Sequence, residues 1–169
     1  MDFSAEQHLD APIATVEAAL VDPGFLETLD DLTTIGPPEV LDTTRHADTV
    51  VQRVRYRFIA DLPAAVTAVV DPHKLTWVEE ARYDLAEHTS THAIVPDNYP
   101  DRLEAHYSCV LTTQSAGTIR TATGEVAVRM ALVHGKVERV IVEGLRDFAT
   151  EQAERLNRWL RDASGPRRP

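Results

Sequence analysis

The sequence predicts an α+β fold, in which an antiparallel β-sheet is covered on one face by a long C-terminal helix. Three observations support this class. Apolar residues recur every three or four positions from about residue 134 to 161, as in an amphipathic helix. Several stretches between residues 39 and 130 alternate apolar and polar side chains, as strands with one covered face do. The first 32 residues add one strand and two short helices.

The N-terminal segment begins with a strand, because alternate residues from Phe3 to Leu9 share one face. Asp10-Ala11-Pro12 is then a helix-start signal, with a capping carboxylate and an early proline. The Asp22-Pro23-Gly24 run breaks this first helix. Apolar residues from Phe25 to Leu32 indicate a second short helix after it.

The middle of the chain predicts five or six antiparallel strands. In the first long run, Val54, Tyr56 and Phe58 share a face with Gln52, and arginines occupy the other face. Further strands are expected over about 75–83, 88–95, 104–113 and 118–130, with a turn at 97–101. Residues 63–70 are rich in alanine and valine and fit either a short helix or an irregular crossing.

The last predicted element is a helix over about 134–161, with charged residues opposite its apolar stripe. Such a stripe must cover another apolar surface, and the available one is a face of the preceding sheet. Leu145 and Phe148 lie on this stripe.

Composition narrows the class of protein further. The chain has 169 residues, of which 43% are apolar and 26% charged, so we expect one domain over 1–163 and a flexible tail over 164–169. A net charge of −10 disfavours nucleic acid and stable association with anionic membranes. The single cysteine, Cys109, excludes an intramolecular disulfide. With no visible signal peptide or transmembrane run, the expected location is the cytoplasm.

The order of elements and several residues resemble the helix-grip fold of the START-like (SRPBCC) superfamily. The start of the chain, Leu9-Asp-Ala-Pro12 followed by Val16, Leu20, Asp22-Pro23 and Phe25-Leu26, is similar to the N-terminal signature of that superfamily. The runs 48–58, 74–80 and 135–139 resemble an uncharacterised START-like family of high-GC Gram-positive bacteria. One departure is Glu17, where many members carry an aromatic residue.

The resemblance implies a curved sheet of about six to seven strands around the C-terminal helix, with a hydrophobic cavity between them. Superfamily members use this cavity for lipids, polyketides, plant hormones or aromatic substrates, and a minority catalyse cyclisation or dehydration. Function does not follow from the fold alone.

Strand alternation and the helical stripe together predict which residues face this cavity. The candidate ligand-binding residues are Val54, Tyr56, Phe58, Trp77, Glu79, Tyr83, Tyr107, Val128, Met130, Leu145 and Phe148. Mixed apolar and aromatic walls with few polar groups are typical of small-molecule pockets. The alternative is that these residues only form the core beneath the helix.

Glu79 is the one weak catalytic candidate, because it lies on an otherwise apolar face. A buried carboxylate must be hydrogen-bonded, paired or protonated. Glu79 is therefore expected either to anchor a ligand hydroxyl or act as a general acid or base, or else to reach solvent at a bulge or edge. Its neighbour Glu80 points the other way and fits a surface ion pair.

The sequence predicts no metal site and no cofactor. His88 and His92 are about 13 Å apart along one strand, and a pairing of His92 with His106 on the outer face lacks a third ligand. No Gly-x-Ser-x-Gly elbow and no glycine-rich phosphate loop are present. Cys109, mid-strand on the inward face, fits a buried and inert thiol.

The leading functional hypothesis is a carrier that binds an apolar, lipid-like or polyketide-like small molecule between sheet and helix. The two short helices and the loop near Pro63 are expected to form the entrance. The alternatives are an aromatase- or cyclase-type enzyme using Glu79 with Tyr56, Tyr83 or Tyr107, and a protein-interaction module whose cavity is filled by side chains. The sequence leaves the oligomeric state open.

Overall fold

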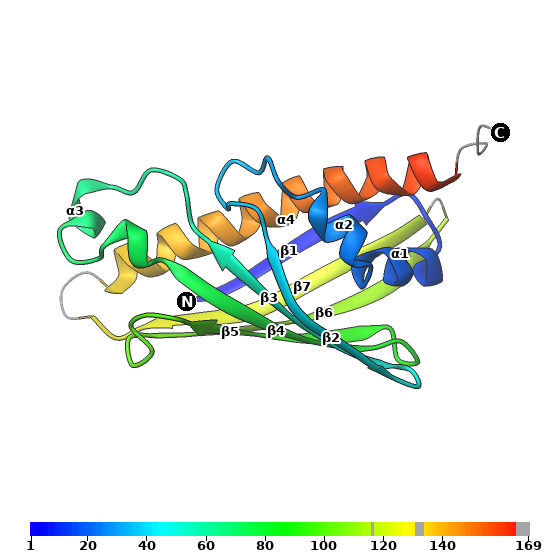
Figure 1. Ribbon diagram of the computed structural model, residues 1–169, viewed down its shortest axis with the longest axis horizontal. Helices are drawn as coiled ribbons and strands as arrows, with labels where there is room; N and C mark the ends of the chain where they lie inside the picture. The colour runs from blue at the N-terminus through cyan, green and yellow to red at the C-terminus, as the bar shows by residue number, and fades with distance from the viewer. Residues whose placement is uncertain (116, 131–133, 165–169) are drawn as a thin grey trace.

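The computed structural model describes residues 1–115, 117–130 and 134–164, and it has the predicted order of elements (Figure 1). The N-terminal elements are β1 (Asp2–Leu9), α1 (Ile13–Leu20) and α2 (Pro23–Glu27). The middle of the chain forms β2 (Glu39–His46), β3 (Thr49–Arg57), α3 (Ala64–Thr67), the 3₁₀ turn η1 (Pro72–Lys74), β4 (Thr76–Asp84), β5 (Thr89–Pro96), β6 (Leu103–Gln114) and β7 (Gly117–Val128). The long helix α4 (His134–Ser164) follows.

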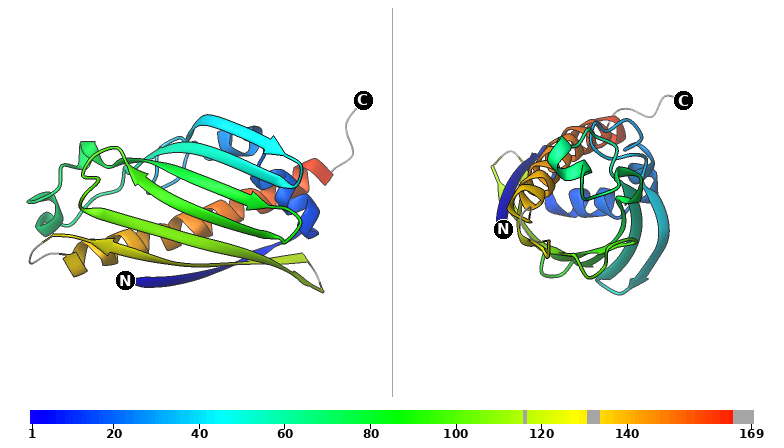
Figure 2. Two further views of the ribbon diagram at one scale, coloured as in Figure 1. Left: turned by 90° about the horizontal axis from the view of Figure 1, so that it is seen from below. Right: turned by 90° about the vertical axis from the view of Figure 1, so that its left-hand side faces the viewer.

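The seven strands form one antiparallel sheet in the order β1-β7-β6-β5-β4-β3-β2. The first strand therefore pairs with the last, and the others follow as neighbouring hairpins. Viewed end-on, the sheet curves around α4 (Figure 2). This is the helix-grip fold expected from the sequence.

Two elements differ in detail from the sequence-based expectation. The second helix ends at Glu27, although Leu29 and Leu32 beyond it are still buried. The ambiguous stretch at 63–70 contains a single helical turn, α3. Ser164 is the last residue of α4, and residues 165–169 of the predicted tail lie outside the described residues.

Asp22 shows how the chain turns between the first two helices. Its carboxylate accepts a hydrogen bond from Gly24 N at 2.8 Å and caps α2, which begins with Pro23. The cap directs Phe25 onto the C-terminal half of α4, where its ring meets Trp159 edge-on at 6.2 Å. The first two helices thus cover the end of the molecule where α4 finishes (Figure 1).

Glu17 stands where many members of the superfamily that the sequence resembles carry an aromatic residue, and the structure explains this difference. Glu17 is buried in α1, and its carboxylate accepts a hydrogen bond from His88 Nδ1 at 3.0 Å. His88 lies in the β4–β5 turn with a positive φ of 56°. A polar contact therefore joins α1 to the rim of the sheet at this point, without an aromatic residue in the helix.

The interior is divided into two apolar clusters. One lies beneath α1, α2 and the C-terminal half of α4, and contains Val16, Phe25, Leu29 and Leu156. The other lies beneath α3 and the N-terminal half of α4, and contains Val66, Ile94 and Val137 among others. Trp77 packs against both clusters. The second cluster surrounds the candidate site.

Candidate functional site

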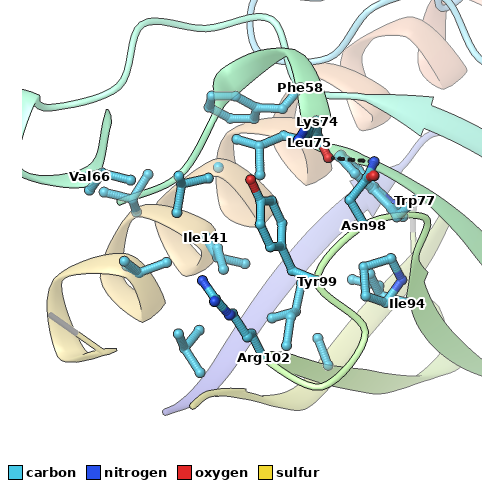
Figure 3. Close-up of a pocket in the computed structure, with 18 of the residues that line it drawn as sticks. Phe58, Val66, Lys74, Leu75, Trp77, Ile94, Asn98, Tyr99, Arg102 and Ile141 are labelled. Atoms are coloured by element: carbon cyan, nitrogen blue, oxygen red, sulfur yellow. Dashed lines mark hydrogen bonds between the residues drawn. The ribbon is translucent and has the colours of Figure 1, made fainter. Parts of the chain in front are cut away.

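An apolar cavity of about 140 Å³ lies between the sheet and the N-terminal half of α4 (Figure 3). A single water needs roughly 10–15 Å³ of such space, so side chains do not fill this interior. The hypothesis of an interaction module with a filled cavity does not agree with this volume.

Strands and helix contribute opposite walls of the cavity. The inward-facing strand residues of the wall are Trp77, Ile94, Pro96, Leu103, Ala105 and Val128. The helical wall is formed by Val137, Val140, Ile141, Gly144 and Leu145, which recur along one side of α4. Every second residue of a strand and every third or fourth residue of the helix face each other, and these side chains enclose one apolar volume.

The mouth of the cavity lies where α4 begins, at the end that carries α3. Leu62, Val66 and Val70 from the α3 segment line it, with Lys74, Asn98, Tyr99 and Arg102 from η1 and the β5–β6 turn. No residue of α1 or α2 lines it. The expectation that the two short helices form the entrance is therefore wrong, because they cover the opposite end. The loop near Pro63 does border the cavity.

Five of the eleven candidate ligand-binding residues line this cavity: Phe58, Trp77, Val128, Met130 and Leu145. The other six lie elsewhere in the interior: Val54, Tyr56, Glu79, Tyr83, Tyr107 and Phe148. Most of these pack deeper along the sheet. Tyr56 stacks on Trp77 at 5.8 Å and meets Phe148 edge-on, so these rings form an aromatic layer behind the Trp77 part of the cavity wall.

A polar cluster lies on the inner face of the sheet next to this aromatic layer. Glu79 Oε1 accepts hydrogen bonds from His92 Nδ1 at 2.9 Å and from the Tyr107 hydroxyl at 3.0 Å. A hydrogen bond of 2.9 Å joins His92 Nε2 and Ser90 Oγ, and the imidazole stacks on Tyr107 at 4.2 Å. Glu79 is thus a paired interior carboxylate, and the alternative that it reaches solvent at an edge is wrong.

The charges of this pair follow from its contacts. Burial alone would raise the pKa of Glu79, but the hydrogen bond and charge of His92, followed by Tyr107 and Arg120, outweigh it and lower this pKa. Burial would lower the pKa of His92, yet its hydrogen bonds to Cys109 and Glu79 leave that pKa raised. Both pKa shifts favour the charged forms, a carboxylate on Glu79 and an imidazolium on His92.

Arg120 and Cys109 extend the cluster toward α4. Arg120 is buried on β7, and its Nη1 donates to Gln152 Oε1 at 2.8 Å. Burial opposes ionisation of Cys109, but the charge on Arg120 and the hydrogen bond to His92 outweigh it and lower the pKa of the thiol to about 7. Cys109 is buried, as expected, although its surroundings are polar.

Sequence reasoning placed His92 wrongly, on the outer face opposite His106. The register pairs His92 with Tyr107 and Ala93 with His106, so His92 is buried and His106 exposed. On β5, Ala93 and Val95 make the outer face look as apolar as the face that carries Ile94. The local pattern therefore did not show which face is inward, and Val95 is in fact 45% exposed. Arg120 was missed as well, although it shares the inward parity of Val126 and Val128.

We expect the His92–Glu79 pair to make stability depend on pH. The stabilisation from a raised His92 pKa is complete below the unfolded value of about 6.5 and is lost as pH rises through the folded pKa. That from a lowered Glu79 pKa is present above about 4.3 and is lost as pH falls through its folded value. The loss of Tm caused by His92→Gln should therefore be larger at pH 5.5 than at pH 9 in thermal unfolding.

His106→Gln is the matched control, because His106 lies exposed on the outer face of the neighbouring strand. It should cost little at either pH. An equal loss of Tm for His92→Gln at both pH values would show that the pair carries no net charge-dependent stabilisation.

Residues that could hold a metal ion do not gather among the described residues, where no group of three or more His, Cys, Asp or Glu side chains has suitable spacing. In the same part of the chain, no helix is both long enough and apolar enough to cross a bilayer. The site is thus an apolar cavity with a polar rim and a charged cluster behind its inner wall.

A curved sheet that encloses a long helix, with an apolar cavity between them, is the architecture of the helix-grip fold. Solved structures of this class match nearly the whole chain. The chain belongs to the family described as "Protein of unknown function (DUF2505)", whose model matches residues 4–160. No curated protein matched the chain.

Three solved structures illustrate the likeness. Protein TTHA0849 from Thermus thermophilus is 18% identical, with a TM-score of 0.67 over 98% of this chain and 100% of its own. The ZhuI aromatase/cyclase from Streptomyces sp. R1128 is 16% identical, with a TM-score of 0.68 over 98% and 99%. Norcoclaurine synthase from Thalictrum flavum is 13% identical, with a TM-score of 0.65 over 98% and 96%. At these identities the likeness shows the fold alone.

Proposed function

We propose that this protein binds an apolar small molecule, lipid-like or polyketide-like, in the cavity between the sheet and α4. The observation that carries the proposal is the cavity itself. Its walls are apolar on both the sheet side, with Trp77, and the helix side, with Leu145, and its charged side chains lie at the mouth. Enclosed apolar walls with a few polar groups are the usual design of small-molecule sites.

Thr34 supports an occupant of this kind. Its Oγ1 atom is buried without a hydrogen-bond partner among the described residues, and Thr34 lines the cavity. Buried hydroxyl groups are normally paired, so rotation of this side chain toward a molecule in the cavity would give Oγ1 the partner that it lacks. The solved structures that resemble this chain agree with the proposal at the level of the fold.

Gly144 provides a direct test, because a Cβ at this position would extend into space on the cavity wall. The nearest side-chain atom, Phe58 Cε2, lies 3.7 Å from that Cβ, an ordinary contact. Gly144→Leu should fill part of the cavity and weaken binding of the neutral fluorescent probe N-phenyl-1-naphthylamine at least tenfold. Native mass spectra of Gly144→Leu purified from cells should also lack the added small-molecule mass expected for the wild type.

Gly144→Ala is the matched control, since alanine fits without displacing Phe58 and favours the helix. It should bind the probe within about twofold of the wild type, a margin of less than about 0.5 kcal/mol. If wild type and Gly144→Leu bind the probe equally, or if the wild type neither binds it nor carries any added mass, the proposal is wrong.

The charged cluster supports a second candidate, an aromatase- or cyclase-type enzyme. Glu79 and Trp77 are inward-facing neighbours on β4, so Glu79 lies one step beyond the cavity wall. Its side chain is 13% exposed. A ligand extending past Trp77 would meet a carboxylate that can take up a proton. The two candidates differ in the fate of the ligand. A carrier releases its ligand with the mass unchanged, whereas an enzyme of this type should change the mass of the ligand when the two are incubated together.

A further inference from the structure

The charges at the cavity mouth are all of one sign. Lys74 and Arg102 line the cavity, and no aspartate or glutamate does so among the described residues. This contrasts with the protein as a whole, whose acidic excess gives a net charge of −10. In Figure 3, Lys74 and Arg102 lie on either side of Tyr99 at the mouth.

Three carboxylates close in sequence to these cations, Asp71, Asp97 and Glu104, have other partners, and Asp101, next to Arg102, forms no ion pair with it in the described part of the chain. Asp71 accepts a hydrogen bond from His73 N at 3.0 Å and so caps η1. Asp97 forms an ion pair with Arg55 Nε at 3.4 Å. Within the described part of the chain, neither Lys74 nor Arg102 has a carboxylate oxygen within 4.0 Å. Within the described residues, no direct ion pair with a carboxylate therefore neutralises these two cations.

Tyr99, which also lines the cavity, has an unusual backbone conformation. Its φ is 58°, in the left-handed region that bulky residues rarely adopt. Its ring lies under the Arg102 guanidinium at 5.5 Å, and its hydroxyl accepts from Asp71 N at 3.5 Å. Ala47 and His88 have similar φ values, so this conformation belongs to the turns between strands.

We propose that the ligand is a single-chain amphiphile with an anionic head group, carboxylate or phosphate. Its chain occupies the apolar cavity, and its head lies between Lys74 and Arg102. This inference rests on the proposed function and adds the chemical class of the ligand. Arg102 presents a planar fork of donors and Lys74 a point charge, so both suit an anion that stays partly hydrated at the mouth.

The test compares four compounds with the same twelve-carbon chain: dodecanoate, dodecyl phosphate, 1-dodecanol and dodecylammonium. Affinities are measured by displacement of N-phenyl-1-naphthylamine, below the micellar range. Lys74→Gln and Arg102→Gln should each weaken dodecanoate and dodecyl phosphate about two- to fivefold, the size of an exposed ion pair. Both variants should leave dodecanol within twofold and bind dodecylammonium more tightly than the wild type.

Arg82→Gln is the control for net charge, because Arg82 lies exposed on the outer face of β4, away from the cavity. It should change none of the four affinities. The tighter of the two anions identifies the head group. Equal effects of Lys74→Gln on dodecanoate and dodecanol, or no effect on either, would overturn the head-group inference while the cavity proposal stands. Failure of all four chains to displace the probe would instead count against the proposed function.

Discussion

Replacing Glu79 with alanine is expected to lower the free energy of unfolding by about 3–5 kcal/mol, the usual cost of removing one partner from a buried ion pair. The carboxylate accepts hydrogen bonds from both His92 and Tyr107. Its loss leaves two interior donors without their acceptor, and burial then disfavours the charge on His92. Urea unfolding followed by tryptophan fluorescence measures the change, since Trp77 and Trp159 lie in different parts of the interior.

The neighbouring residue supplies the matched control. Glu80 lies on the outer face of the same strand and pairs with Arg53 Nε at 3.1 Å, with both side chains about half exposed. Glu80→Ala should therefore cost about 0–1 kcal/mol. Equal losses for the two variants would mean that the interior pair contributes no more than a surface pair, which contradicts the role assigned to the cluster.

Gly124→Ala is expected to destabilise the protein by about 2–3 kcal/mol, a large effect for one added methyl group. Gly124 on β7 lies between Phe3 on β1 and Tyr107 on β6, and these two rings meet across it at 6.1 Å. A Cβ at residue 124 would lie 2.8 Å from Tyr107 Cα and closer still to the His106 carbonyl oxygen. Backbone atoms cannot yield as a flexible side chain can.

The sign of this effect is informative, because alanine in place of glycine normally stabilises a strand interior. Gly144→Ala, where the added Cβ makes only an ordinary contact, should be neutral or stabilising by up to about 1 kcal/mol. We also expect Gly124→Ala to displace Tyr107 and disturb its hydrogen bond to Glu79, visible in the tyrosine ring signals by NMR. A Gly124→Ala protein as stable as the wild type would show that β6 and β7 move apart freely.

Local patterns along the chain predict most of the fold and part of the site. The alternation around Tyr56, Trp77 and Cys109 predicts correctly which side of β3, β4 and β6 faces α4, because one covered face imposes a period of two. The same rule predicts the inward position of Glu79 and its difference from Glu80. Five lining residues follow from this rule and from the apolar stripe of α4.

The partners of Glu79 could not be predicted in the same way. His92 and Tyr107 meet because Tyr107 is opposite His92 in the β5–β6 register, and a shift of one residue would put His106 there instead. Ala93 and Val95 make that alternative equally apolar. The register was therefore decided by pairing over the whole strand and not by the local pattern.

The cavity mouth shows the same limit. Lys74, Tyr99 and Arg102 lie in turns, which have no periodicity from which to read the direction of a side chain. Their approach to the α3 segment depends on the paths of three loops between strands. Composition indicates an acidic protein, and only the folded chain shows that the cavity mouth carries positive charge alone.

By itself, the sequence determined the order of the elements, the side of most strands that faces the helix, and the long apolar stripe that the sheet must cover. These depend on periodicity and turn chemistry, which act over a few residues. The tertiary structure decided which end of the molecule is open, which groups surround Glu79, and which cations meet at the mouth. Each of these depends on residues brought together across strands and loops, where sequence separation carries no information about distance.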